Sequence, residues 1–241
     1  MPLQTVESSR LYRQIAEQLR GLIAGGEFDA GTRLPAERDL ARQLGVSRPS
    51  VREALIALEV EGWVEVRTGS GIYVQPPQQR SGARSPRNGN GTGTDWGPLE
   101  LMRARELVEG EVAALAARHA RKIQIAAMDA ALARMHEEVE AGVEPAGGDE
   151  AFHTAISDAC GNSVLVDTVH GYWSARQGPL FERLGDWFET PASWNAALVE
   201  HAAVLDAIRA RDADAARAAM QQHLRKATAR YGASWKRAKR A

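Results

Sequence analysis

Apolar residues recur at helical spacing near the start of the chain, at Leu11, Ile15, Leu19 and Leu22. This spacing predicts an amphipathic helix, which the Gly25-Gly26 pair is suited to end. A second helix is predicted from Pro35 to Gly45. A proline fits the first turn of a helix because the N–H that it lacks would have no partner there.

A third helix and a hairpin are predicted to follow. Ser47 is placed to cap the helix, whose apolar stripe then points inward and leaves the opposite face free. Residues 64–67 and 72–74 flank the segment Thr-Gly-Ser-Gly, which is the pattern of a two-stranded hairpin. We therefore expect a winged helix-turn-helix over residues 8–75.

The remainder of the chain is expected to be helical. Residues 76–96 have almost no apolar content and many Gly, Pro and Ser residues, which is typical of a linker. Residues 97–232 are rich in alanine and predict an antiparallel bundle of six or seven helices, followed by a basic tail at 233–241. The apolar stripes lie at 97–120, 125–142, 147–160, 163–184, 193–210 and 212–231. The fold class is therefore mainly α, with two domains.

Composition is that of an ordinary globular protein. The 241 residues suit two compact domains, and 44% of them are hydrophobic while 25% are charged. The lone Cys160 cannot form an internal disulfide, and no apolar run approaches the roughly 20 residues that cross a bilayer. We expect a cytoplasmic protein without a membrane role. The net charge of -1 decides nothing about nucleic acid, because it sums over both domains.

The predicted third helix carries side chains suited to DNA. Its first turn holds Ser47, Arg48 and Ser50, and the Arg fork matches the acceptors that guanine shows in the major groove. We also consider DNA contacts by Arg38, by Arg52 one turn after Arg48, and by Thr68 and Gly69 in the wing. The alternative for Arg48 is a solvated charge, and for Arg52 an internal pair with Glu37 or Glu53.

These residues carry a resemblance to a known family. Residues 10–74 resemble the winged helix-turn-helix of the GntR family of bacterial transcription regulators, through Leu-Pro-Ala-Glu-Arg-Asp-Leu-Ala, Gly-Val-Ser-Arg, Val-Arg-Glu-Ala-Leu and Glu-Gly-Trp-Val in family order. The resemblance implies that double-stranded operator DNA is bound by Arg38, Ser47, Arg48, Ser50, Arg52, Thr68 and Gly69. Pro49 departs from the family, where many members have a Thr-like donor.

Four side chains of the helical region have the chemistry of a metal site. Asp149 and His153 are four residues apart, so that a helix places them on one face, and His201 and His223 belong to two later helices. A carboxylate and three imidazoles are ligands for borderline divalent ions. The alternative is a buried histidine cluster satisfied by hydrogen bonds.

Residues 97–230 resemble the helical FCD ligand domain of the FadR-type branch of the GntR family. The resemblance rests on Asp-Glu-Ala-Phe-His at 149–153, Ala-Cys-Gly-Asn-Ser-Val-Leu at 159–165, Glu-His at 200–201 and the run that ends at Leu224. It implies a metal held by Asp149, His153, His201 and His223, which we expect to be zinc, with nickel or manganese as alternatives. It also implies that Arg105 pairs with a carboxylate effector, whereas Asn162 either contacts the effector or caps a helix.

The two resemblances together imply a homodimeric, ligand-responsive transcription factor that acts as a repressor. Residues 172–174, 178–181 and 193–194 are similar to members that control hexuronate catabolism, which implies a sugar acid or related carboxylate as effector. Two alternatives stay open at this point. The metal itself is the signal, or the protein is a metal-dependent hydrolase. The sequence offers no general base for hydrolysis, because Glu150 and Glu200 are expected to point off the ligand face, and we therefore expect no enzyme.

Overall fold

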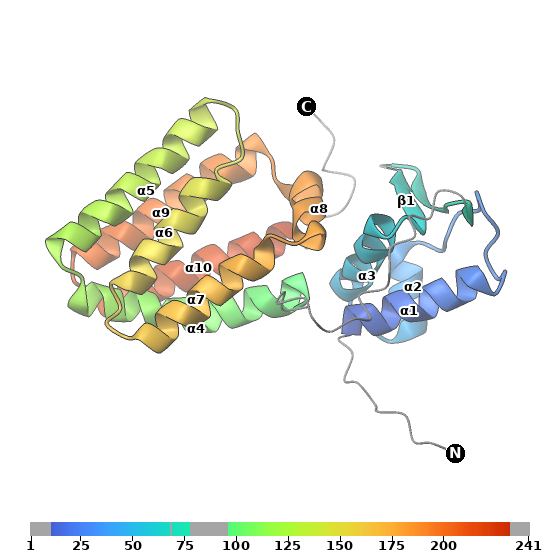
Figure 1. Ribbon diagram of the computed structural model, residues 1–241, viewed down its shortest axis with the longest axis horizontal. Helices are drawn as coiled ribbons and strands as arrows, with labels where there is room; N and C mark the ends of the chain where they lie inside the picture. Colours follow the sequence, from blue (N-terminus) through green and yellow to red (C-terminus); the bar gives the residue numbers. More distant parts are fainter. Residues whose placement is uncertain (1–10, 68, 78–95, 232–241) are drawn as a thin grey trace, which may run out of the picture. The chain divides into compact units, whose positions relative to one another are not determined.

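The computed structural model describes residues 11–67, 69–77 and 96–231 (Figure 1). Contacts within the chain separate an N-terminal unit that ends at Pro98 from a C-terminal unit that begins at Leu99. Most of the predicted linker, residues 78–95, and the whole predicted tail lie outside the described residues. The two units are described separately below.

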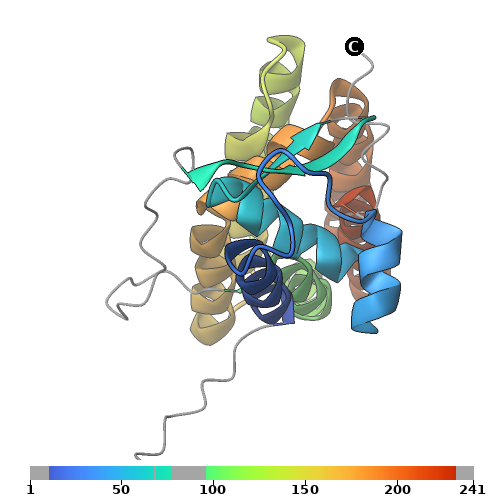
Figure 2. The ribbon, with the colours of Figure 1, turned by 90° about the vertical axis from the view of Figure 1, so that its right-hand side faces the viewer.

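The N-terminal unit is three helices and a hairpin. Its elements are α1 (Leu11–Ala24), α2 (Glu37–Leu44), α3 (Arg48–Val60), β1 (Val64–Arg67) and β2 (Gly71–Val74). The helix α3 packs against α1, α2 and β1, and the antiparallel strands pair with Val64 opposite Val74 (Figure 2). Val51, Leu55 and Leu58 of α3 are completely buried at the centre of this unit. The predicted winged helix-turn-helix is confirmed.

The turn before α3 forms as the sequence predicts. Gly45 ends α2 with a φ of 66°, a left-handed conformation that favours glycine. Ser47 caps α3, because its Oγ accepts a hydrogen bond from the Ser50 N–H at 3.2 Å. The prediction for Pro35 is wrong, since α2 begins at Glu37. The Leu34 N–H donates to the Ile72 carbonyl at 2.8 Å, so the chain up to Pro35 is held against the hairpin and turns into the helix afterwards.

The described part of the C-terminal unit forms seven helices and no strand. They are α4 (Pro98–His119), α5 (Lys122–Glu140), α6 (Ala146–Asp158), α7 (Ser163–Arg176), α8 (Pro179–Phe188), α9 (Pro191–Arg209) and α10 (Ala213–Tyr231). The helix α5 packs on α6 and α9, α9 packs on α10, and α6 packs on α7. Ion pairs tie α4 to α10, with Arg217 Nε 2.6 Å from Glu111 Oε1. The predicted helical bundle is therefore confirmed.

One helix predicted from the sequence is two helices in the structure. The stripe at 163–184 continues in helical phase, but α7 ends at Arg176 and α8 begins at Pro179. A proline inside a helix removes one backbone hydrogen bond and clashes with the preceding turn, whereas at the first position of a helix it costs nothing. The break at Pro179 therefore redirects the chain into α8.

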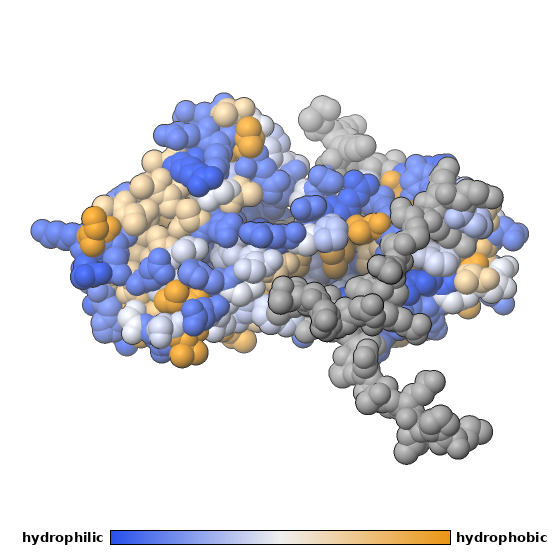
Figure 3. Space-filling model, in the orientation of Figure 1, coloured by the Kyte–Doolittle hydropathy of each residue, from blue (hydrophilic) through white to orange (hydrophobic). Residues whose placement is uncertain are grey.

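The described helices include none that is both long and apolar enough to cross a membrane. On the face drawn in Figure 3, hydrophilic residues are spread over the surface, strongly hydrophobic ones lie in small separate groups, and mildly hydrophobic ones form one wider area. Single exposed apolar residues of this kind are ordinary for a folded chain in water.

The close approach of α5 and α6 depends on Gly148. A Cβ at this position would lie 2.5 Å from Met135 Cγ and 2.7 Å from the Met135 backbone nitrogen. Gly148→Ala is therefore expected to destabilise the C-terminal unit by about 1 to 3 kcal/mol, because helix backbone must move. Thermal unfolding should register about 2 to 4 °C per kcal/mol.

The control for this substitution is Gly171→Ala in α7, where a Cβ meets nothing within 4 Å. It should leave stability unchanged or raise it by about 0.5 to 1 kcal/mol, the helix penalty of glycine. Equal unfolding temperatures for the two variants would contradict the packing argument.

Candidate functional site

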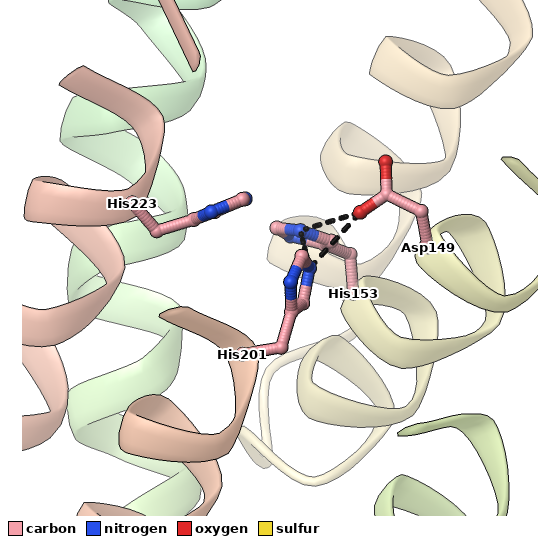
Figure 4. A group of neighbouring side chains, drawn as sticks. All are labelled: Asp149, His153, His201 and His223. Carbon is pink, nitrogen blue, oxygen red and sulfur yellow. Dashed lines mark hydrogen bonds and ion pairs between the residues drawn. The ribbon is translucent and has the colours of Figure 1, made fainter. Parts of the chain in front are cut away.

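The four residues predicted to bind metal meet inside the C-terminal unit. Asp149 and His153 lie one turn apart on α6, His201 projects from α9 and His223 from α10, and all four side chains point toward one another (Figure 4). One ligand atom from each lies within 4.8 Å of the others. The three histidines are buried and the aspartate is partly exposed. The fold thus joins residues that are up to 74 positions apart, from 149 to 223.

The shortest contacts within the cluster join Asp149, His153 and His201. His201 Nε2 lies 3.0 Å from Asp149 Oδ1 and 3.3 Å from His153 Nε2. His153 Nε2 lies 3.5 Å from the same aspartate oxygen. Two imidazole nitrogens and a carboxylate oxygen thus share one small volume, in which a positive charge is needed to offset the carboxylate.

The other ring nitrogen of every histidine has an oxygen acceptor. His153 Nδ1 donates to Glu109 Oε2, His201 Nδ1 donates to the Ala197 carbonyl at 2.7 Å, and His223 Nδ1 donates to Glu200 Oε2 at 2.9 Å. Carbonyl and carboxylate oxygens only accept, so the proton of each neutral ring sits on Nδ1. In a neutral ring of this kind, Nε2 keeps its lone pair. Metal-binding histidines are commonly oriented in this way.

The electrostatics of the cluster favour ionised carboxylates and a neutral His223. Burial and the nearby His201 lower the pKa of His223 to about 3. Burial would raise the pKa of Asp149, but hydrogen bonds from His153 and His201 outweigh it and hold this pKa well below its usual value. Burial likewise opposes ionisation of Glu109, yet Arg105 and His153 lower its pKa to about 2. Imidazoles and carboxylates bind metal in these deprotonated forms.

His153 differs from His223 in its charge environment. Burial disfavours its charged form, but Glu109 and Asp149 outweigh burial and raise its pKa. The single positive charge of a protonated His153 offsets only one of these two carboxylates. A divalent cation at the same place would offset the negative charge of both carboxylates. The donor set therefore suits a divalent ion, and a self-contained histidine cluster would have the same contacts with His153 protonated.

Two residues of this site were not predicted from the sequence. Glu200 was expected to point away from the ligands, but α10 packs beside α9 and brings His223 and Arg230 to it, with Arg230 Nη2 at 2.8 Å. Glu109 lies on α4, far from the histidines in sequence. The only sequence feature that pointed to Glu109 was its position four residues after Arg105, a spacing at which two charged residues on a helix can form an ion pair.

A cavity lies beside the cluster. Its empty volume is about 530 Å³, open solvent at its mouth included. It is lined by Arg105, Met135, Glu144, Pro145, Ala146, Asp149, Arg176, Glu189, Trp194, Ala197, His223, Leu224, Ala227 and Arg230. Two of the candidate metal ligands, Asp149 and His223, are therefore within reach of a molecule in the cavity.

The structure places Arg105 at this cavity but not as a free cation. Its side chain is 2% exposed, and Nε lies 2.5 Å from Glu109 Oε1. The guanidinium also packs against the Trp173 ring, 4.6 Å from its centroid. Arg176 also lines the cavity: its Nη1 lies 3.3 Å from Asp149 Oδ2, and its guanidinium packs against the same Trp173 ring. Both arginines are thus fixed next to the predicted ligands.

The structure does not bring Asn162 to the cavity. Asn162 precedes α7, where its Oδ1 accepts hydrogen bonds from the backbone N–H groups of Val164 and Leu165 at 3.0 and 3.3 Å. This is the capping role that the sequence left open as the alternative to effector contact. The residues that line the cavity come from other parts of the fold.

The residues predicted to read DNA divide into exposed and buried groups. The side chain of Arg38 is 77% exposed and that of Arg48 is 55% exposed, with Arg48 Nε 3.0 Å from Glu37 Oε1. Ser47 and Ser50 lie at the exposed start of α3, where their hydroxyl groups are 2.8 Å apart. Gly69 is at the wing tip with a φ of 75°, and Thr68 lies outside the described residues.

Arg52 is the correction in this set. Its side chain is only 3% exposed, and Nε and Nη2 contact Glu37 Oε2 at 3.0 and 2.9 Å. Because Arg52 falls on the inward side of α3, it joins α3 to α2 within the unit, as in the alternative interpretation of the sequence. An arginine held in this way does not present its guanidinium to DNA.

Comparisons with known proteins agree with this architecture. The profile of the "Bacterial regulatory proteins, gntR family" matches residues 11–74, and that of the FCD domain matches residues 100–226. The chain is 37% identical to the Uxu operon transcriptional regulator of Escherichia coli K12 over 220 residues, which cover 90% of this chain and 85% of that protein.

Two further relatives are similar along nearly their whole length. The Exu regulon transcriptional regulator of Escherichia coli K12 is 36% identical, over 92% of this chain and 84% of its own. The HTH-type transcriptional repressor NanR of Klebsiella aerogenes is 30% identical, over 96% and 89%. Among solved structures, E. coli McbR/YncC has the same fold, with a TM-score of 0.50 at 21% identity, over 93% of this chain and 98% of its own. The chain is a transcription regulator rather than an enzyme, and it belongs to the GntR family of bacterial DNA-binding regulators, with a C-terminal FCD domain.

Proposed function

We propose that this protein is a cytoplasmic, homodimeric repressor of sugar-acid catabolism that leaves its operator when a hexuronate or related carboxylate binds the C-terminal unit. The observation that carries the proposal is the convergence of three imidazole Nε2 atoms and the Asp149 carboxylate beside a cavity. The names of the relatives, regulators of the Uxu operon and the Exu regulon, support hexuronate genes as the target.

The proposed site would hold a divalent ion, with zinc preferred and nickel or manganese as alternatives, through Asp149, His153, His201 and His223. When bound, the ion supplies a Lewis-acidic centre with open positions for effector oxygens. Glu109 and Glu200 hold the rings of His153 and His223 in place. Arg176 and Arg105 set positive charge next to the cavity for a carboxylate.

Release from DNA requires that the effector bind one state of the protein more tightly than the other. Couplings of this kind are typically about 1 to 3 kcal/mol. Two linked reading heads on neighbouring half-sites make operator affinity sensitive to their spacing. We therefore infer that the effector changes the placement or mobility of the heads.

The test is thermal unfolding of the purified chain with galacturonate, glucuronate and simple carboxylates, before and after removal of metal by a chelator. A ligand at 100 times its dissociation constant should add about 2.7 kcal/mol of stability. A hexuronate-selective shift that disappears with the metal, and a matching loss of operator binding, is the expected result. Absence of any shift in metal-loaded protein would refute the effector class.

The second candidate function is a metal sensor, in which the ion is the signal. It is favoured by the same buried cluster and predicts operator affinity that follows metal concentration without any organic ligand. Operator titrations with metal alone separate the two functions.

DNA binding in this proposal depends on Arg48. Arg48→Ala is expected to weaken operator binding by about 1 to 3 kcal/mol, the cost of losing an arginine that reads a base. Fluorescence anisotropy with operator DNA measures the change. Arg42→Ala is the control, since Arg42 is similarly exposed on α2 but pairs with Asp39 on its own helix. Equal affinities for the two variants would remove Arg48 from the reading surface.

A further inference from the structure

Acidic side chains border the cavity beside the metal-site residues. Glu144 lies in the loop before α6, and Glu189 follows α8. A Cβ at Gly185 would be 3.7 Å from Glu144 Oε1, so the Glu144 carboxyl group extends toward α8. The cavity wall thus includes two carboxylates in addition to Asp149.

The two glutamates are held close enough to influence each other. Partial burial of the carboxyl group, together with the charge of Glu189, raises the pKa of Glu144. Ser193 Oγ donates to Glu189 Oε2 at 2.9 Å and fixes that carboxylate at the start of α9. A second negative group brought to this wall would be repelled, whereas a group that can donate a hydrogen bond would be bound.

A buried donor lies next to the glutamates. Trp194, in the first turn of α9, lines the same cavity, and its indole Nε1 is buried without a hydrogen-bond partner among the described residues. Leaving such an N–H without an acceptor costs free energy, and a buried orphan of this kind calls for an explanation. A ligand oxygen in the cavity would provide its acceptor.

The arginines at the cavity are largely balanced by other acids. Arg105 pairs with Glu109, and Arg230 contacts Glu200 at 2.8 Å. Arg176 faces Asp149. The proposed metal site would bind one carboxylate of the ligand. The paired arginines of the lining leave little positive charge for a second carboxylate.

We propose that Glu144, Glu189 and Trp194 recognise the hydroxyl groups of the effector and make the site selective for a polyhydroxylated monocarboxylate over a dicarboxylate of the same length. A hydroxyl group both donates and accepts, so it satisfies the glutamates as a donor and the indole as an acceptor. A carboxylate on the ligand can only accept hydrogen bonds, and it would be repelled by the negative charges of Glu144 and Glu189. This inference rests on the proposed function, because it assigns the specificity of the same effector site.

The test uses calorimetric titration of the metal-loaded, full-length protein with galacturonate and with galactarate, which carries a second carboxylate in place of the aldehyde. Glu144→Gln and Glu189→Gln keep the side-chain shape and remove the charge. Each should lower galacturonate affinity by about 10-fold, as expected for a hydrogen bond to a charged group, while galactarate affinity stays the same or rises. Galacturonate has the same ring form in every titration, so this form does not affect the ratio of its affinities for variant and wild-type protein. Glu182→Gln on α8, exposed and outside the cavity lining, is the control.

Trp194→Phe keeps most of the ring and removes the N–H. Galacturonate affinity should fall about 10-fold, whereas the unfolding temperature without ligand should stay the same or rise, because an unsatisfied donor is removed. A merely structural tryptophan would instead lower that temperature.

The proposal is overturned if the glutamine variants keep wild-type affinity for galacturonate, or if they lose affinity for both acids equally. These results differ from failure of the proposed function. In that case the metal-loaded wild-type protein would bind no sugar acid at all.

Discussion

Replacing His153 with alanine is expected to reduce bound zinc from about one ion per chain to almost none, and to abolish the stabilisation by sugar acids. His153 is the most enclosed member of the cluster, since Nδ1 is held by Glu109 while Nε2 faces both His201 and Asp149. Its loss removes one of four donors and leaves Glu109 buried without one of its partners. Metal analysis of untagged protein after dialysis measures the first effect, and thermal unfolding with galacturonate the second.

His170→Ala is the matched control for this experiment. His170 is exposed on α7 and outside the cluster, so this variant should keep wild-type metal content and ligand response. Glu200→Gln should have an intermediate effect, because loss of a residue that orients a ligand typically costs about 10- to 100-fold in metal affinity. Full zinc content in the His153 variant would remove the metal site from the proposal, while leaving the DNA-binding unit unaffected.

Replacing Arg52 with alanine is expected to destabilise the N-terminal unit by about 3 to 5 kcal/mol, the usual cost of breaking one side of a buried ion pair. Glu37 would keep its charge at 7% exposure after losing the buried guanidinium of Arg52, and the Arg48 side chain beside it is half-exposed. Chemical denaturation of the full chain measures this change. Operator binding should fall as well, because the unit that presents Arg48 is partly unfolded.

Two controls separate the buried pair from a general charge effect. Arg42→Ala, at an exposed position of α2, should change stability by no more than about 0.5 kcal/mol. Combining Arg52→Met with Glu37→Leu should recover much of the stability, since apolar residues of similar volume often replace a buried pair without loss. Wild-type stability of Arg52→Ala alone would show that Arg52 is not the structural residue described above.

The N-terminal unit could be predicted almost completely, because its determinants are local. The apolar spacing of α1 and α3, the Ser47 cap, Gly45 and the glycines of the wing each act within a few residues. The predicted place of Pro35 in the first turn of α2 was wrong because of a contact with a distant part of the chain. The bond from Leu34 to Ile72 holds that segment to a hairpin more than thirty positions later in the chain.

The grouping of the four candidate ligands was also predictable, although only through the resemblance to a family. Helical spacing alone joins Asp149 to His153, and nothing local joins either of them to His201 or His223. The apolar pattern also predicted one helix across Pro179 where the structure has two, because periodicity does not depend on the N–H that proline lacks.

Local features of the sequence were therefore enough to predict most of the helices, the hairpin and the chemical types of the candidate ligands, because propensity, capping and periodicity depend on neighbours along the chain. The partners of the charged groups followed from the packing of the helices. Packing buried Arg52 against Glu37, set Glu109 and Glu200 behind His153 and His223, and placed Glu144, Glu189 and Trp194 around one cavity. Burial and electrostatic pairing depend on which helices meet, and these contacts join residues that are distant in the sequence.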